Sequence, residues 1–182
     1  RRDRALAKGG RMGGAAIYEN TKAEELCIEN GAIVGVHTDR GFLKSSTVIL
    51  CGGMWSREIA KSVGVELPLH ACEHFYVVTE EMDGLTPRPV LRDFDKGVYF
   101  KEDAGKMLVG WFEHNAKGLS MDRISEDFCF DQFPCDMEHI EEYLIRGMET
   151  FPKFGEVGIR TWFNGPESFT SDNLHLMGPT PE

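Results

Sequence analysis

The chain has 182 residues, 41% of them hydrophobic, which suits one globular domain or one domain with part of another. Its 20 basic and 30 acidic side chains give a formal net charge of −10, which argues against binding to nucleic acid or to an anionic membrane. No apolar run approaches the roughly 18 residues of a membrane span. Five cysteines without a CxxC pair favour a reducing compartment, so we expect a cytoplasmic protein.

The N-terminal third is predicted to contain a short helix followed by strands. The helix covers residues 3–12 and ends at Gly13-Gly14. Asn30-Gly31 is the strongest turn signal and predicts a hairpin. We expect strands over residues 16–19, 25–29 and 33–38.

A continuous apolar run over residues 47–51 predicts a fully buried strand. Gly52-Gly53 breaks it, and Ser56 is a candidate N-cap for a helix that reaches about residue 63. A strand that runs into glycines and then a helix exposes backbone N–H groups to a ligand. An ordinary tight turn needs the same glycines, and neither GxGxxG nor GxxxxGK[ST] occurs in the chain.

From Leu67 onward the pattern changes to short strands with Asp/Gly turns, which favours antiparallel pairing. Residues 136–150 have the apolar spacing of an amphipathic helix, which Pro152 ends. Residues 115–134 are expected to be irregular, and 164–172 to form an ordinary loop. The predicted strands are 70–79, 90–92, 97–101, 107–113 and 158–164. The predicted fold class is therefore α+β rather than doubly wound α/β.

Three residues of the 70–79 strand, His70, Cys72 and His74, share one face because side chains alternate along a strand. They are a possible zinc set, although their spacing is wide and a fourth ligand is missing. The alternatives are a partly buried polar strand, or a catalytic or substrate-orienting role for His74. Tyr99 either packs or, if it faces the same cavity as His74, orients a carboxylate or an amine.

The order and spacing of several segments, given below, resemble those of the flavin-dependent amine oxidoreductases of the dimethylglycine and sarcosine dehydrogenase family. The resemblance extends from about Arg4 to Pro179. Its landmarks are Glu19-Asn-Thr21, 33–41, 48–58, Pro68-Leu-His-Ala-Cys-Glu-His-Phe-Tyr-Val-Val-Thr79, Pro89-Val-Leu-Arg-Asp93, Tyr99-Phe-Lys-Glu102, Gly110-Trp-Phe-Glu113 and 164–172.

The resemblance implies a two-domain enzyme in which an antiparallel substrate domain roofs the flavin of an FAD-binding domain. The implied reaction oxidises an N-methyl amine to an imine, with electron transfer to FAD. By position, His74 and Tyr99 are implied substrate-side, catalytic residues. The implied cofactor-binding residues are Ala23 (usually Val in the family), Gly52, Gly53, Trp55, Asn164, Gly165 and Pro166.

The resemblance also implies an internal fragment, because the GxGxxG segment and the C-terminal glycine-rich segment of such enzymes are absent. We expect residues 1–66 to be part of the FAD-binding domain, 67–164 the substrate domain and 165–182 the start of the return to the FAD domain. The chain alone is then expected to bind no FAD, to be inactive, and to form a homodimer through its exposed former domain interface. A eukaryotic parent implies the mitochondrial matrix. The remaining alternatives are a small metal-binding protein and a non-catalytic interaction module of the same fold.

Overall fold

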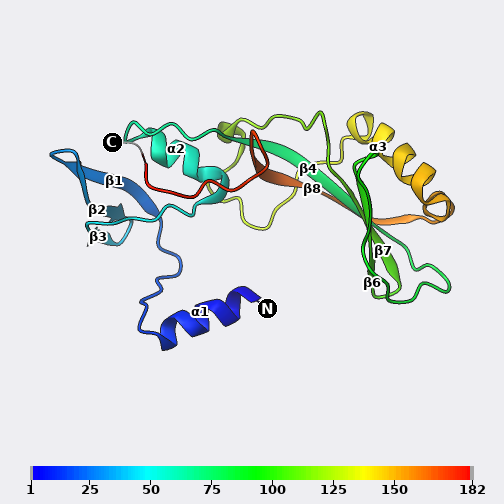
Figure 1. Cartoon of the computed structure of the whole chain (residues 1–182), viewed down its shortest axis with the longest axis horizontal. Helices are drawn as coiled ribbons and strands as arrows, with labels where there is room; N and C mark the ends of the chain where they lie inside the picture. The colour runs from blue at the N-terminus through cyan, green and yellow to red at the C-terminus, as the bar shows by residue number, and fades with distance from the viewer. Residues whose placement is uncertain (1, 181–182) are drawn as a thin grey trace. The chain divides into compact units, whose positions relative to one another are not determined.

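A computed structural model describes residues 2–180. These residues divide into two compact units, the first comprising residues 2–67 and 177–180 and the second residues 68–176. The elements of both units are labelled in Figure 1. Among residues 2–180, the structure contains no helix that is both long and apolar enough to span a membrane.

The first unit contains a helix, a small sheet and a second short helix. The sheet is antiparallel in the order β1-β2-β3. Asn30 (φ 50°) and Gly31 (φ 78°) form the predicted hairpin turn, since both adopt the left-handed conformation that such a turn requires. The elements are α1 (Arg2–Met12), β1 (Ala23–Glu29), β2 (Ala32–Thr38), β3 (Gly41–Lys44), η1 (Gly53–Trp55) and α2 (Ser56–Lys61).

Three predictions for this unit were wrong. Residues 16–19 form no strand, and residues 47–51 form neither a strand nor a buried segment, since Ile49 is 82% exposed. An apolar strand is buried only when neighbouring strands pair with it, and no described strand pairs with 47–51. Ser56 is the first residue of α2 rather than its cap, and the cap position, Trp55, makes no side-chain hydrogen bond.

The second unit is built on a five-stranded sheet in the order β5-β6-β7-β4-β8 with antiparallel neighbours throughout. The antiparallel α+β fold that the sequence predicts is therefore confirmed. The strands are β4 (Leu69–Thr79), β5 (Leu91–Asp93), β6 (Val98–Asp103), β7 (Lys106–Trp111) and β8 (Ile159–Thr170).

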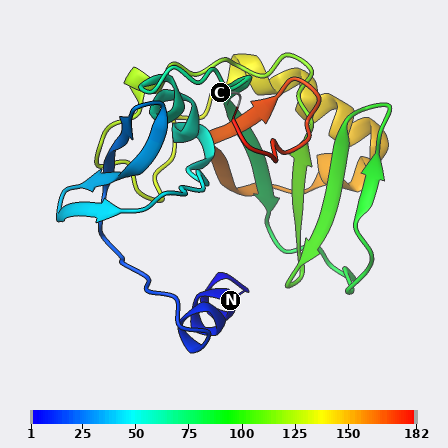
Figure 2. The same ribbon diagram turned by 60° about the vertical axis from the view of Figure 1, so that its left-hand side comes forward.

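One face of this sheet is covered by α3 (Met137–Thr150), as Figures 1 and 2 show. Asp136 caps the helix, because its side chain accepts a hydrogen bond of 3.2 Å from the His139 N–H. Short 3₁₀ turns, η2 (Met121–Arg123) and η3 (Pro152–Glu156), lie before and after it. The buried core between helix and sheet contains Phe75, Val77, Val98, Phe100, Met107, Val109, Trp111, Ile140, Tyr143, Leu144 and Phe154.

Residues 164–172 were predicted as a loop, but β8 covers the first seven of them, as far as Thr170, and only residues 171–172 form a turn. Pro166 lies opposite Glu73 in the β4–β8 register. Proline is tolerated there because β8 is an edge strand, where a missing N–H need not break a ladder. Asn164, Gly165 and Pro166 are thus strand residues, and successive ones point to opposite faces of the sheet.

Candidate active site

The two faces of β4 differ in burial. The odd-numbered residues from Ala71 to Thr79 are buried, and Phe75 and Val77 belong to the core beneath α3. On the opposite face, His74 and Tyr76 are only partly buried. We call this the second face. The strand registers place on it Arg92, Tyr99, Tyr76, His74, Phe163, Gly165 and Glu167, and Phe112 joins it through its ring contact with Tyr99. The candidate site lies on it.

A row of paired residues crosses the second face from β5 to β8. Tyr99 pairs with both Arg92 and Gly110, and Gly110 pairs in turn with Tyr76. The Tyr99 ring lies directly over Gly110, because a Cβ placed on Gly110 would be 2.3 Å from the Tyr99 hydroxyl oxygen. Tyr76 stacks on Phe163 of β8 with ring centroids 4.5 Å apart. The glycine therefore lets an aromatic layer lie flat on the sheet.

The Tyr99 hydroxyl lies among charged groups of both signs. Burial is the main reason that the pKa of Tyr99 is raised, and the nearby carboxylate of Glu167 raises it further. The Arg92 guanidinium acts in the opposite direction. Arg92 itself lies over the Phe112 ring, 4.6 Å from the centroid, a cation–π distance. Tyr99 is consequently a protonated hydroxyl with a cation and an anion in its electrostatic environment.

His74 lies on the same face, opposite Gly165 of β8. Its Nε2 is 3.7 Å from a carboxylate oxygen of Glu167, whose side chain is 55% exposed. Its Nδ1 is 3.2 Å from Oε1 of Glu113, within ion-pair distance although the angles do not meet hydrogen-bond criteria. The Phe169 ring meets the imidazole edge-on at 6.1 Å. Carboxylates therefore contact both ring nitrogens of His74.

Glu113 and His139 complete this arrangement and were missed by sequence reasoning. Glu113 follows β7, and its side chain is only 1% exposed. Its Oε2 lies 2.6 Å from Nε2 of His139, in the first turn of α3. Glu113 was the last residue of the predicted 107–113 strand and part of the Gly110-Trp-Phe-Glu113 landmark, but neither signal indicated a role for its side chain. The pairing with His139 depends on how α3 packs, which no local pattern reveals.

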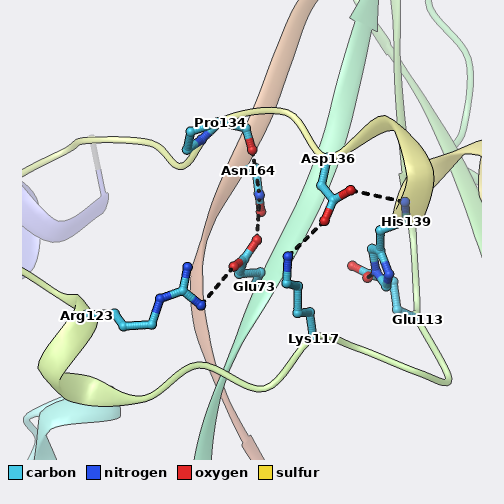
Figure 3. Close-up of polar contacts among 8 residues, drawn as sticks. All are labelled: Glu73, Glu113, Lys117, Arg123, Pro134, Asp136, His139 and Asn164. Carbon is cyan, nitrogen blue, oxygen red and sulfur yellow. Dashed lines mark hydrogen bonds and ion pairs between the residues drawn. The ribbon is translucent and has the colours of Figure 1, made fainter.

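A second polar cluster, shown in Figure 3, lies on the helix-covered face of β4. Glu73 is 8% exposed and accepts a hydrogen bond of 2.9 Å from the Asn164 side-chain amide, which also donates to the Pro134 carbonyl. Arg123 lies 3.8 Å from the other oxygen of Glu73. Asn164 and Pro166 thus lie on the opposite side of the sheet from His74, whereas Gly165 lies beside it.

The other predicted cofactor residues belong to the first unit. Ala23 is exposed at the start of β1. Gly53 has φ 56°, with no atom within 4 Å of the position its Cβ would occupy, and Trp55 is 48% exposed. The open Gly53 backbone fits close approach by a flat or extended ligand. The sequence contains no GxGxxG loop of the kind that holds a pyrophosphate.

The zinc alternative finds no support in the described part of the chain. Among residues 2–180, no group of three or more His, Cys, Asp or Glu side chains could hold a metal ion. His70 is exposed, whereas Cys72 is buried and its thiol pKa is raised, first by burial and then by Glu113. His70, Cys72 and His74 therefore share a face of β4 without converging on a common point.

Comparison with known proteins identifies the family. The model of the FAD dependent oxidoreductase (DAO) family matches residues 3–182. The chain belongs to this family. It is 35% identical over 179 residues to a 4-methylaminobutanoate oxidase (formaldehyde-forming) of Paenarthrobacter nicotinovorans. The matched region covers 98% of this chain and 22% of that relative. It is 31% identical over 182 residues to human mitochondrial sarcosine dehydrogenase, and the match covers 97% of this chain and 20% of that relative.

The chain is also similar to a protein named as a regulatory subunit. A mouse mitochondrial pyruvate dehydrogenase phosphatase regulatory subunit is 32% identical over 183 residues, with 97% of this chain and 20% of the relative covered. Among solved structures, L-proline dehydrogenase from P. horikoshii has a TM-score of 0.73 at 22% identity, with 92% of this chain and 43% of that chain covered. The chain thus spans about a fifth of the length of these curated relatives.

Proposed function

We propose that this chain is the substrate-binding part of a flavin-dependent oxidoreductase that oxidises an N-methyl amino acid to an imine. In this proposal the second unit is the substrate domain and the first unit is part of the FAD-binding domain. The observation that carries the proposal is the second face, where His74 and Tyr99 lie between an exposed cation, Arg92, and an exposed anion, Glu167. An amino acid carries the same two charges on one small molecule.

The face offers a place for each end of such a substrate. Glu167 attracts the ammonium group, and Nε2 of His74, 3.7 Å from the same carboxylate, accepts its proton to give the neutral amine that oxidation requires. The Tyr99 hydroxyl, which its raised pKa keeps protonated, donates to the substrate carboxylate. Arg92 adds a positive charge at that end.

FAD, when bound, supplies the acceptor for the two electrons and the hydrogen removed from the methyl carbon. The work of the protein is to hold the amine at a fixed distance and to remove its proton. Tyr76 and Phe163, stacked at 4.5 Å, form a flat apolar surface that excludes water around the reacting carbon. Water then hydrolyses the imine to a demethylated amine and formaldehyde.

The N-methyl specificity is supported by two relatives, whose names identify 4-methylaminobutanoate and sarcosine as their substrates. The test uses the full-length protein loaded with FAD and a panel of N-methyl amino acids, with the desmethyl amino acids and the carboxylic acids without an amine as controls. Single-turnover reaction without oxygen, followed by mass spectrometry, is expected to yield the demethylated amine and formaldehyde in one-to-one ratio. Reaction with the desmethyl amino acids alone would refute the proposal.

The 182-residue chain by itself is proposed to be inactive, because it contains no GxGxxG loop to hold the cofactor's pyrophosphate. Mixing the purified chain with FAD and desalting it tests this. We expect the flavin to separate from the protein. Stoichiometric retained flavin would contradict the assignment of the phosphate-binding loop to residues outside this chain.

A non-catalytic role is the second candidate, and the relative named as a regulatory subunit favours it. The two candidates differ in what Tyr99 and His74 do. In an enzyme, Tyr99→Phe and His74→Gln reduce amine turnover in the FAD-loaded full-length protein, on the order of 10²-fold or more for His74→Gln if it is the base. A non-catalytic protein yields no product from any amine, with or without these changes.

A further inference from the structure

The buried carboxylate of Glu113 is the most constrained charged group in the second unit. Its side chain is 1% exposed, and it lies between two imidazoles that reach it from different elements, His74 from β4 and His139 from α3. The distances are 3.2 Å from Oε1 to His74 Nδ1 and 2.6 Å from Oε2 to His139 Nε2. A buried carboxylate is costly unless polar partners satisfy it. His139 is within hydrogen-bond distance of Oε2. Oε1 and His74 Nδ1 are both buried, lie 3.2 Å apart, and have no other hydrogen-bond partner among the described residues, although their angles do not meet hydrogen-bond criteria.

An ionised carboxylate accepts hydrogen bonds and donates none. The nitrogens that face it must therefore carry the protons, which assigns N–H to Nδ1 of His74 and to Nε2 of His139. In neutral His74 the unprotonated nitrogen is then Nε2, the atom beside Glu167 on the second face. The buried carboxylate thereby determines which nitrogen of His74 acts as a base toward the second face.

We propose that Glu113 is a positioning residue that fixes the Nδ1–H tautomer of His74 and leaves Nε2 able to take a proton from a bound ammonium group. His139 anchors the other oxygen of Glu113, and its own backbone N–H is bound by the Asp136 cap. The chain of contacts thus joins the N-terminus of α3 to the second face. The catalytic meaning rests on the proposed function, whereas the tautomer assignment does not.

Imidazole ¹⁵N NMR of the 182-residue chain tests the assignment directly, because the two nitrogens of a neutral histidine have distinct chemical shifts. The spectra are recorded at a pH where the imidazoles are neutral. In the wild-type chain we expect His74 in the Nδ1–H form and His139 in the Nε2–H form. Wild-type His74 in the Nε2–H form would overturn the proposal, so the test does not depend on any variant folding.

Glu113→Gln changes the hydrogen bonding at nearly constant shape. The shorter contact keeps the amide oxygen on His139, so the new NH₂ faces Nδ1 of His74 and the ring must switch to the Nε2–H form. Glu167→Gln is the matched control, because it removes the same charge from the other side of His74 and is expected to leave the Nδ1–H form in place. A switch in Glu167→Gln, or none at His74 in Glu113→Gln, would show that Glu113 does not govern the ring.

These readouts separate the two proposals. If the full-length protein oxidises no amine but the tautomers behave as stated, the positioning role stands and the catalytic assignment fails. If amines are oxidised but His74 keeps its tautomer in Glu113→Gln, the proposed function stands and the positioning role fails.

Discussion

Gly110→Ala is expected to disturb the second face through one identified contact. The new Cβ would lie 2.3 Å from the Tyr99 hydroxyl oxygen and 2.7 Å from a ring carbon, distances that no packed side chain sustains. The Tyr99 ring must turn away. Overpacking of this kind costs about 1–3 kcal/mol. Replacing glycine restricts the unfolded chain and returns about 0.4–1 kcal/mol, so we expect a net loss of stability of about 1–2 kcal/mol.

Gly165→Ala is the matched control, because it is a strand glycine on the same face with no atom within 4 Å of its Cβ position. Urea unfolding is expected to show Gly165→Ala unchanged or slightly more stable. Tyr99→Ala removes the obstructing ring, so Gly110→Ala made in that background should lose most of its cost. Equal stabilities for the two glycine variants, or a cost of Gly110→Ala that persists without Tyr99, would show that contact with the Tyr99 ring is not what destabilises Gly110→Ala.

The Lys117 ammonium, and then the His139 N–H, lower the pKa of Asp136. The stability that the Asp136 carboxylate contributes is therefore complete above about pH 3.9 and is lost as the pH falls through its lowered pKa. In urea unfolding over a range of acid pH, Asp136→Asn should be less stable than wild type above about pH 3.9, and this difference should shrink at lower pH; a constant difference would contradict it. Buried Cys72, with a raised thiol pKa, should react with iodoacetamide more slowly than exposed Cys129 in peptide mass spectra, and equal rates would contradict its burial. Exposed apolar side chains such as Phe94, which is 80% exposed, can be buried between two copies of the chain. We therefore expect light scattering to show a dimer that forms as the protein concentration rises, and a monomer at high concentration would contradict this.

The second unit was largely predictable because its signals are local. Alternation over residues 70–79 and the apolar spacing of residues 136–150 correspond to β4 and α3 within a residue or two. Each pattern reports on a single element and on the face that it buries. These patterns therefore predicted the type of fold without knowledge of how the elements pack.

The wrong predictions share a different cause. An apolar run such as 47–51 becomes a strand only where other strands pair with it, and a segment rich in turn residues, such as 164–172, remains extended when a long neighbour, β4, pairs with it. Glu113 and His139 are 26 residues apart in sequence, and only the packing of α3 on the sheet brings them together. Periodicity carries no information about such pairs.

We propose that the second face, with His74 and Tyr99, is where an amine substrate loses its proton and is oxidised. The most direct test is the single-turnover reduction of flavin in the FAD-loaded full-length protein, followed by stopped-flow absorbance without oxygen over a range of pH. Wild type is compared with His74→Gln and Tyr99→Phe. We expect flavin reduction to be slowed on the order of 10²-fold or more in His74→Gln, and substrate binding to be weaker in Tyr99→Phe. Reduction at the wild-type rate and with the wild-type pH profile in both variants would contradict it.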